Sequence, residues 1–164
     1  MNDRSLNVVE SYNPVTNRWT THTPTPTSIH HAAFLGGRWE NICNWGRPDS
    51  SYEDTDIIER NDPVLDKWVT DLEPIPSKRS GIAATSVDGS IYVLGGEQRR
   101  GTFDNNERFN PITNTWTIEA AMPTARHGLG VASIDGKICL IGGGPNPGST
   151  VSWKNEIYKV NKPS

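Results

Sequence analysis

The sequence predicts an all-β protein made of repeated four-stranded antiparallel sheets, and three observations support this prediction. A segment that ends in tryptophan recurs, so that Trp19, Trp68 and Trp116 stand 49 and 48 residues apart. A block with Asp-Gly, an apolar run and two glycines occurs twice, at an offset of 47 residues. The 164 residues include 15 Gly, 12 Pro and 6 Trp, a composition that suits short strands joined by tight turns. Helices are not expected.

The tryptophan-bearing segment predicts two strands with a turn between them. It reads YNPVTNRW at 12–19, NDPVLDKW at 61–68 and FNPITNTW at 109–116. Asn-Pro or Asp-Pro reverses the chain, so the strand before the turn is expected to pair with the strand that carries the tryptophan. A glutamate precedes the turn in each copy and recurs at intervals of 49, 48 and 49 residues, as Glu10, Glu59, Glu107 and Glu156. The fourth glutamate indicates a further, partial copy.

The second block predicts the other two strands of each period. It reads VDGSIYVLGG at 87–96 and IDGKICLIGG at 134–143. Asp-Gly is the strongest short signal for a hairpin, and the β-rich run after it forms the second strand. The glycines that close the two blocks can take up positive φ or admit another backbone: Gly95, Gly96, Gly142 and Gly143. Each period is therefore expected to be a four-stranded meander. One such sheet cannot bury both faces, so neighbouring sheets should stack radially into a propeller.

The repeat as a whole resembles the kelch motif, which has a period near 50 residues, Asp-Gly, a double glycine and a tryptophan about 20 residues later. The resemblance covers nearly the whole chain and implies kelch-type β-propeller blades. The copies at 79–122 and 126–160 match it most closely. The copy at 30–75 departs from it, because GGRWENICNWG at 36–46 has a polar strand and no second double glycine. That blade is expected to be either distorted or functionally specialised.

The chain is predicted to be a single kelch-repeat unit over residues 1–164. Its parts are a partial blade (1–24), a degenerate blade (25–75), a blade (76–122) and a C-terminal partial blade (123–164). About three periods are present, and both ends lie at third strands, near 6–13 and 156–160. Closed propellers have about four to eight blades, so we expect an incomplete ring or half of a six-bladed assembly. A fragment of a longer chain is the favoured explanation, and a homodimer and an unusual small closure are the alternatives.

Charge and hydropathy argue against two classes of partner. The net charge is −3, the pI is about 5.8 and no basic stripe occurs, so nucleic acid is not expected as a partner. No run of 18 apolar residues is present, and the start lacks the apolar segment of a secretory signal. A membrane is therefore not expected. Because no signal peptide is seen, the cytoplasm is the default compartment, unless the given sequence lacks the N-terminus of a longer parent protein. Cys43 and Cys139 are predicted to be free thiols.

Five residues are the candidates for ligand binding: Arg79, Arg126, His127, His30 and Arg38. Arg79 and Arg126 occupy the same repeat position, before the first strand of a blade. The kelch resemblance places this stretch at a face that holds ligands, and arginine binds carboxylates with two parallel hydrogen bonds. The alternative is that each arginine pairs with a glutamate or carbonyl of a neighbouring blade. His30 and His127 are also equivalent, but further metal ligands are not evident, so neither a metal nor a cofactor is predicted.

The favoured function is a binding module that contacts a protein or peptide through loops between strands. The alternative is a carbohydrate-directed enzyme, because the family resemblance extends to sialic-acid mutarotases and galactose oxidase, which act as complete rings; carbohydrate is accordingly a second candidate ligand. No spacing of residues supports a catalytic arrangement, so an enzyme is the less favoured class. The residues expected to maintain the repeat itself are Trp19, Trp68, Trp116, Gly95, Gly96, Gly142 and Gly143.

Overall fold

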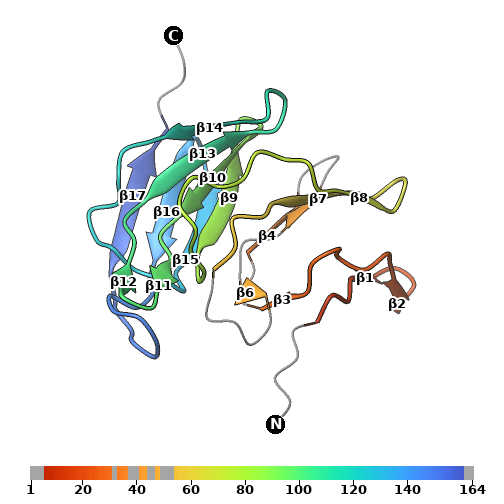
Figure 1. Ribbon diagram of the computed structural model, residues 1–164, viewed down its shortest axis with the longest axis horizontal. Helices are drawn as coiled ribbons and strands as arrows, with labels where there is room; N and C mark the ends of the chain where they lie inside the picture. Colours follow the sequence, from red (N-terminus) through yellow and green to blue (C-terminus); the bar gives the residue numbers. More distant parts are fainter. Residues whose placement is uncertain (1–5, 31–32, 37–40, 44–46, 49–53, 161–164) are drawn as a thin grey trace.

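The computed structural model describes residues 6–30, 33–36, 41–43, 47–48 and 54–160. Among these residues the regular structure consists of antiparallel β-strands, arranged as an arc of small sheets (Figure 1). The predicted fold class, all-β with kelch-type blades in an incomplete ring, is confirmed. In the part of the chain that the structure describes, no helix is long and apolar enough to span a membrane.

The central blade is a complete four-stranded meander. It contains β9 (Ala83–Val87), β10 (Ser90–Leu94), β13 (Asn106–Asn110) and β14 (Thr115–Ile118), in the spatial order β14-β13-β10-β9. The first turn is formed by Asp88 and Gly89, whose φ angles are 49° and 78°. Two consecutive positive φ values are what a tight hairpin between right-twisted strands requires. The Asp-Gly signal in the sequence therefore fixes this turn.

The C-terminal blade repeats the first three strands of this pattern. Its strands are β15 (Gly130–Ile134), β16 (Lys137–Ile141) and β17 (Asn155–Lys159), and β16 pairs with both neighbours. Asp135 and Gly136 form the first turn with φ angles of 49° and 68°. Among the described residues, the outer edge of β17 has no paired strand.

The second blade keeps the four-strand order with shorter strands. It contains β4 (Phe34–Gly36), β5 (Asn41–Cys43), β7 (Glu59–Asp62) and β8 (Lys67–Val69). The remaining strands form three two-stranded ribbons: β1 (Glu10–Asn13) with β2 (Arg18–Thr21), β3 (Ile29–His30) with β6 (Arg47–Pro48), and β11 (Glu97–Gln98) with β12 (Gly101–Thr102).

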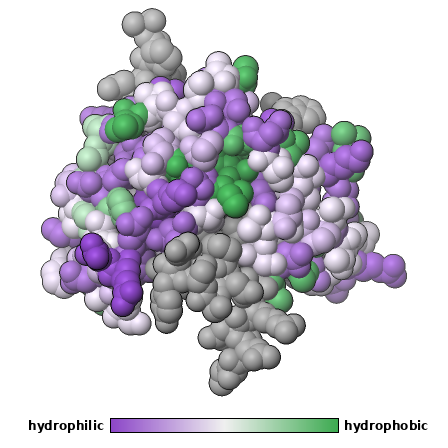
Figure 2. Space-filling view, viewed as in Figure 1, coloured by the Kyte–Doolittle hydropathy of each residue, from purple (hydrophilic) through white to green (hydrophobic). Residues whose placement is uncertain are grey.

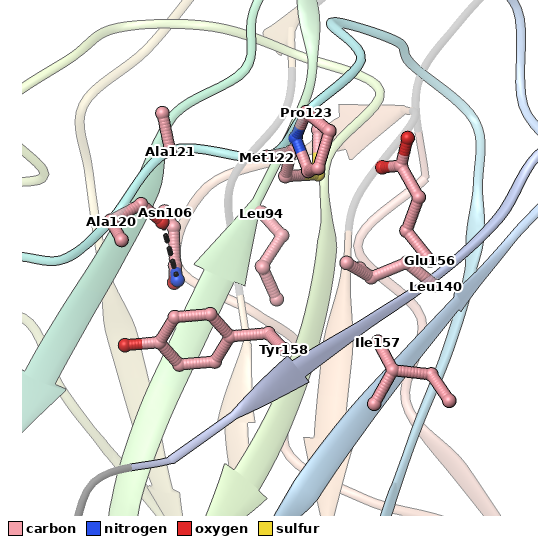
Figure 3. Close-up of a pocket in the computed structure, with 10 residues that line it drawn as sticks. All are labelled: Leu94, Asn106, Ala120, Ala121, Met122, Pro123, Leu140, Glu156, Ile157 and Tyr158. Atoms are coloured by element: carbon pink, nitrogen blue, oxygen red, sulfur yellow. Dashed lines mark hydrogen bonds between the residues drawn. The ribbon is translucent and has the colours of Figure 1, made fainter.

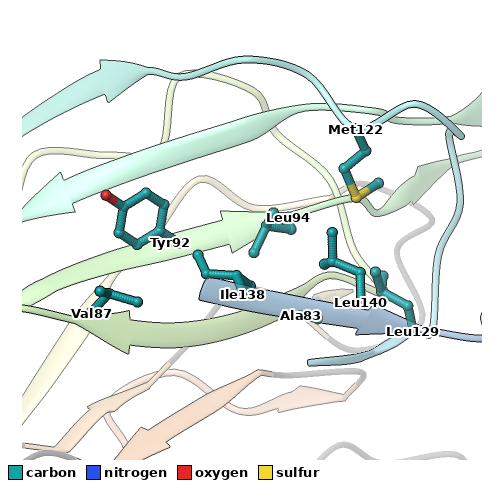
Figure 4. Close-up of a cluster of buried hydrophobic side chains, with 8 residues drawn as sticks. All are labelled: Ala83, Val87, Tyr92, Leu94, Met122, Leu129, Ile138 and Leu140. Atoms are coloured by element: carbon teal, nitrogen blue, oxygen red, sulfur yellow. The ribbon is translucent and has the colours of Figure 1, made fainter. Parts of the chain in front are cut away.

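The core lies between the blades and not within any one of them. β9 contacts β4 on one side and β15 on the other, so the first strands of the three blades lie together. One buried cluster joins the second and central blades: Ala33, Ile58, Ile75, Ile82, Ile91, Val93 and Phe109. The other joins the central and C-terminal blades, with side chains of β10 and β16 directed toward one another (Figure 4): Ala83, Val87, Tyr92, Leu94, Met122, Leu129, Ile138 and Leu140. Burying each large apolar side chain contributes about 1.5–3 kcal/mol, so adjacent blades stabilise each other.

The surface is polar on the side seen in Figure 1. Figure 2 shows that this side is mostly hydrophilic or neutral, with small separate hydrophobic patches among the residues it colours. The open flank of the C-terminal blade carries three exposed isoleucines, Ile134 (63%), Ile141 (57%) and Ile157 (60%). The central-blade counterparts of Ile134 and Ile141, which are Val87 and Leu94, are buried against the C-terminal blade.

Candidate binding face at the loops between blades

Arg79 is buried in the centre of its own blade. Its side chain and that of Glu107 are both 0% exposed, and Arg79 Nη1 lies 2.6 Å from Glu107 Oε2. The guanidinium also donates to the carbonyls of Gly95 (2.6 Å) and Ser77 (2.7 Å). The Ser77 hydroxyl donates to the second carboxylate oxygen of Glu107 at 2.7 Å. Burial lowers the pKa of the Arg79 guanidinium, and the charge of Glu107 partly offsets this effect.

Arg126 repeats this arrangement in the C-terminal blade. Its Nη2 lies 2.9 Å from Glu156 Oε2, and its Nη1 donates to the carbonyls of Gly142 (3.1 Å) and Lys154 (3.0 Å). Thr124 takes the place of the serine and donates to Glu156 at 2.6 Å. Both arginines thus pair with a glutamate and carbonyls of their own blade. A contact with an external ligand stays a prediction, and it would require these ion pairs to open.

The double glycine allows the next blade to approach the buried arginine. The Gly96 N–H donates to the Arg126 carbonyl at 2.9 Å, across the boundary between the central and C-terminal blades. At Gly95, whose φ is 64°, a Cβ would collide with that same carbonyl. Glycine is therefore needed here because another backbone fills the space of a side chain.

His127 lies at the boundary between the same two blades and is largely covered. Its side chain is 13% exposed, its Nε2 is 3.0 Å from the Asn146 carbonyl, and its Nδ1 is 3.7 Å from Glu97 Oε2. The same Glu97 oxygen accepts the Gly148 N–H at 2.9 Å. His127 and Glu97 therefore hold the loop at 145–150 against the central blade.

The structure gives less information about the other two candidates, His30 and Arg38. His30 lies in β3, and its backbone pairs with that of Arg47 in β6. Arg38 lies outside the described residues. The structure thus brings Arg79, Arg126 and His127 to one blade boundary, and a joint site that includes His30 and Arg38 stays a prediction. Among the described residues, no three His, Cys, Asp or Glu side chains gather into a possible metal site.

Two loops lie next to His127 at this boundary. The loop at 95–105 contains the β11–β12 ribbon, and the loop at 142–154 lies beside it at the same end of the molecule (Figure 1). The Thr102 hydroxyl joins them by donating to the Pro145 carbonyl at 2.9 Å. Together they form what we call the loop face, which is defined by residues 95–105 and 142–154.

The loop face carries exposed residues that the repeat pattern does not explain. Trp153 is 95% exposed and Val151 is 90% exposed, while Arg99 and Arg100 at the tip of the β11–β12 ribbon are also exposed. Sequence reasoning missed Trp153. The sequence did contain a signal for it. Trp153 does not stand at the repeat position shared by Trp19, Trp68 and Trp116, so the repeat gives it no structural role.

A cavity of about 150 Å³ lies at the outer part of the same blade boundary. Figure 3 shows Met122 and Pro123 on one side of it and Tyr158 and Ile157 on the other. Leu94, Asn106, Ala120, Ala121, Leu140 and Glu156 complete the lining. The Tyr158 hydroxyl donates to Glu119 Oε2 at 3.1 Å, which ties the two blades together beside the cavity.

Tyr158 should make the stability of the fold sensitive to alkaline pH. Burial, followed by the hydrogen bond to Glu119, raises the pKa of Tyr158 from 10.0 to about 12. The folded state thus favours the neutral phenol, so this stabilisation is present below about pH 10 and is lost as pH rises toward 12. Urea unfolding of the native chain and of Tyr158→Phe should show a stability difference that shrinks over this range. A constant difference from pH 8 to pH 11 would contradict the expectation.

The comparisons with known proteins agree with this architecture. Residues 78–123 match the kelch motif. The chain is 32% identical to Kelch-like protein terF of Aspergillus terreus over an aligned length of 125 residues, and the match covers 69% of this chain and 27% of that protein. It is 27% identical to Kelch-like protein 25 of Xenopus tropicalis over 113 residues (69% and 19%), and 31% identical to Beta-scruin of Limulus polyphemus over 107 residues (60% and 11%). The matched parts are thus 11% to 27% of these relatives' lengths. The chain belongs to the kelch-repeat family.

Proposed function

We propose that this kelch-repeat chain is a binding module that contacts a protein or peptide partner through the loop face. The observation that carries the proposal is the exposure of Trp153 and Val151 on one loop and of Arg99 and Arg100 on the other, where the Thr102–Pro145 hydrogen bond joins the two loops. Tryptophan and arginine are enriched among the residues that dominate binding energy at protein interfaces. Because its side chain is exposed, Trp153 does not contribute to the hydrophobic core.

The bracing of the loops supports the same proposal. Hydrogen bonds from Thr102 to Pro145 and from Gly148 to Glu97 fix the two loops at their bases. A loop that is already ordered loses less conformational entropy when it binds a partner. The exposed side chains of Arg99 and Val151 thus stand on loops that are already ordered.

We propose further that the open flank of the C-terminal blade packs against another blade, from a longer chain or from a second copy. The exposed Ile134, Ile141 and Ile157 support this. No observation favours the carbohydrate-directed enzyme, and a carbohydrate ligand stays a prediction.

Trp153→Ala should remove most of the affinity for partners of the loop face. Peptides selected by phage display on the native chain are expected to bind this variant at least about tenfold more weakly, because a buried indole at an interface contributes a large share of the binding energy. Fluorescence anisotropy with the selected peptides measures the change. Ile112→Ala is the matched control, since Ile112 is 93% exposed in the β13–β14 turn. Equal losses in the two variants, or no loss in either, would refute the proposal.

A further inference from the structure

The β11–β12 ribbon carries a short sequence that suits phosphorylation by a kinase with a preference for basic substrates. Arg99 and Arg100 stand three and two residues before Thr102, and the apolar Phe103 follows it. Such kinases recognise substrates by their charge pattern, because arginine forms charge-assisted, bidentate hydrogen bonds with carboxylates in the substrate cleft. The pair at 99–100 is the only place in the sequence where two arginines are adjacent, so Thr102 stands out from the other hydroxyl side chains.

The structure leaves this segment within reach of an enzyme. Arg99 and Arg100 are exposed and Thr102 is half-buried, on a ribbon that lies at the outside of the arc (Figure 1). The ribbon pairs two residues on each strand, and an isolated two-stranded ribbon is only marginally stable. It can therefore open and enter a kinase cleft in extended form while the blades stay folded. Ser80 also follows two basic residues, but it is 0% exposed and lies out of reach.

Thr102 also takes part in the contact that joins the two loops of the loop face. Its hydroxyl donates to the Pro145 carbonyl at 2.9 Å. Its partner across the ribbon is Glu97, whose carboxylate accepts the Gly148 N–H at 2.9 Å. Directly paired residues of an antiparallel ribbon lie on the same side of it. These two hydrogen bonds between the loops therefore come from one cross-strand pair.

A phosphate on Thr102 acts against both hydrogen bonds. The esterified oxygen has no hydrogen to donate, so the bond from Thr102 to Pro145 is lost. The phosphate also adds a charge of about −1.5 to −2 on the side of the ribbon that carries Glu97. Like charges directly opposite each other are destabilising, so the carboxylate is pushed away from the Gly148 N–H. The loop at 142–154 then loses both of these links to the ribbon.

We propose that Thr102 is the target of a serine/threonine kinase that recognises arginine two and three residues before the hydroxyl, and that phosphorylation releases the loop at 142–154. The kinase transfers the γ-phosphoryl group of ATP. A bond forms between Thr102 Oγ1 and the γ-phosphorus, the bond from that phosphorus to the β–γ bridging oxygen breaks, ADP leaves, and the hydroxyl proton passes to the base of the kinase. The modification does not depend on the loop-face proposal, but its effect on partner binding rests on that proposed function.

Phosphorylation of the full 164-residue chain tests the modification site. The chain is incubated with ATP, Mg²⁺ and the catalytic subunit of cAMP-dependent protein kinase, and tandem mass spectrometry locates the phosphate. We expect a single phosphate, on Thr102. The double variant Arg99→Ala with Arg100→Ala should react at least about tenfold more slowly, because it loses charge-assisted contacts with the kinase. Arg18→Ala removes an exposed arginine of β2 and is the matched control, with the native rate expected.

Exchange of the Gly148 amide hydrogen, followed by NMR, tests the release of the loop. Thr102→Val removes the bond to Pro145 without adding charge, so Glu97 should keep the Gly148 amide protected. In the phosphorylated chain this amide should exchange at least about fivefold faster, because the phosphate repels Glu97. The phosphorylated chain should also bind peptides selected on the loop face at least about tenfold more weakly, since its loop has to be ordered again on binding.

The inference fails if the kinase leaves Thr102 of the folded chain unmodified. A synthetic peptide EQRRGTFD, residues 97–104, then shows whether the sequence is at fault or the ribbon stays closed, and either result overturns the proposal. Equal rates for the native chain and the double arginine variant would also contradict it, as would unchanged exchange at Gly148 after phosphorylation. If Trp153→Ala and Ile112→Ala bind peptides alike, the loop-face proposal fails, and the phosphorylation rate and the Gly148 exchange still decide this one.

Discussion

Replacing Arg79 with alanine is expected to destabilise the chain by about 3–5 kcal/mol, because it leaves the buried carboxylate of Glu107 without its partner. Both side chains are 0% exposed, and their charged atoms are 2.6 Å apart. The Ser77 hydroxyl still donates to Glu107, but it carries no positive charge to replace the guanidinium. Urea unfolding followed by circular dichroism measures the loss.

Two further variants separate the ion pair from general effects of mutation. Arg108→Ala removes an arginine whose pair with Glu119 is partly exposed, at 29% and 22%, and should cost about 1 kcal/mol or less. The double variant Arg79→Met with Glu107→Leu removes both charges and should recover a large part of the loss. If Arg79→Ala lowers the free energy of unfolding by no more than Arg108→Ala does, the buried ion pair does not stabilise the fold as its geometry indicates.

Gly96→Ala is expected to destabilise the chain by about 3 kcal/mol or more, from backbone strain and overpacking together. Gly96 has a φ of 120°, and a Cβ there would lie 2.8 Å from Ile82 Cγ2 and 2.9 Å from the Ser80 carbonyl. Neither a core side chain nor a backbone carbonyl can move away without disturbing the inner strands. The free energy of unfolding in urea is again the measurement.

Gly89→Ala provides the matched control for positive φ without a clash. Gly89 has a φ of 78°, and a Cβ there would meet nothing within 4 Å. Its replacement should cost about 1–2 kcal/mol, the strain of the left-handed region alone. The excess loss in Gly96→Ala then reports the close approach of Ile82 and Ser80, and equal losses would show that packing at the double glycine is not decisive.

The sequence predicted the strands and turns well because they depend on neighbouring residues. Asp88-Gly89 and Asp135-Gly136 form hairpin turns with two positive φ angles, as Asp-Gly implies. The repeat also predicted that Trp68 and Trp116 are equivalent, and their indoles make equivalent hydrogen bonds. The expected polar strand of the second blade falls partly outside the described residues, and its β5 covers Asn41–Cys43.

The sequence predicted the candidate site less well, because burial is set by residues far along the chain. Arg79 and Arg126 are polar and precede strands, so they suit a ligand-binding surface as well as a core. Only the fold shows that Glu107 and Glu156 meet them, 28 and 30 residues away. Trp153 has no partner in the repeat, and its exposure could not be read from its neighbours.

The sequence by itself determined that this chain consists of kelch-type meanders, because strand alternation and turn chemistry act over a few residues and recur with the period. The tertiary structure alone decided which polar residues are buried, which loops face solvent and where the indoles of Trp68 and Trp116 meet the backbone of the preceding blade. The buried ion pairs form within a blade, between residues 28 and 30 positions apart, and the tryptophan contacts form where one blade packs on the next. The tryptophan contacts join residues more than 40 positions apart, and neither kind of contact is encoded by a local pattern.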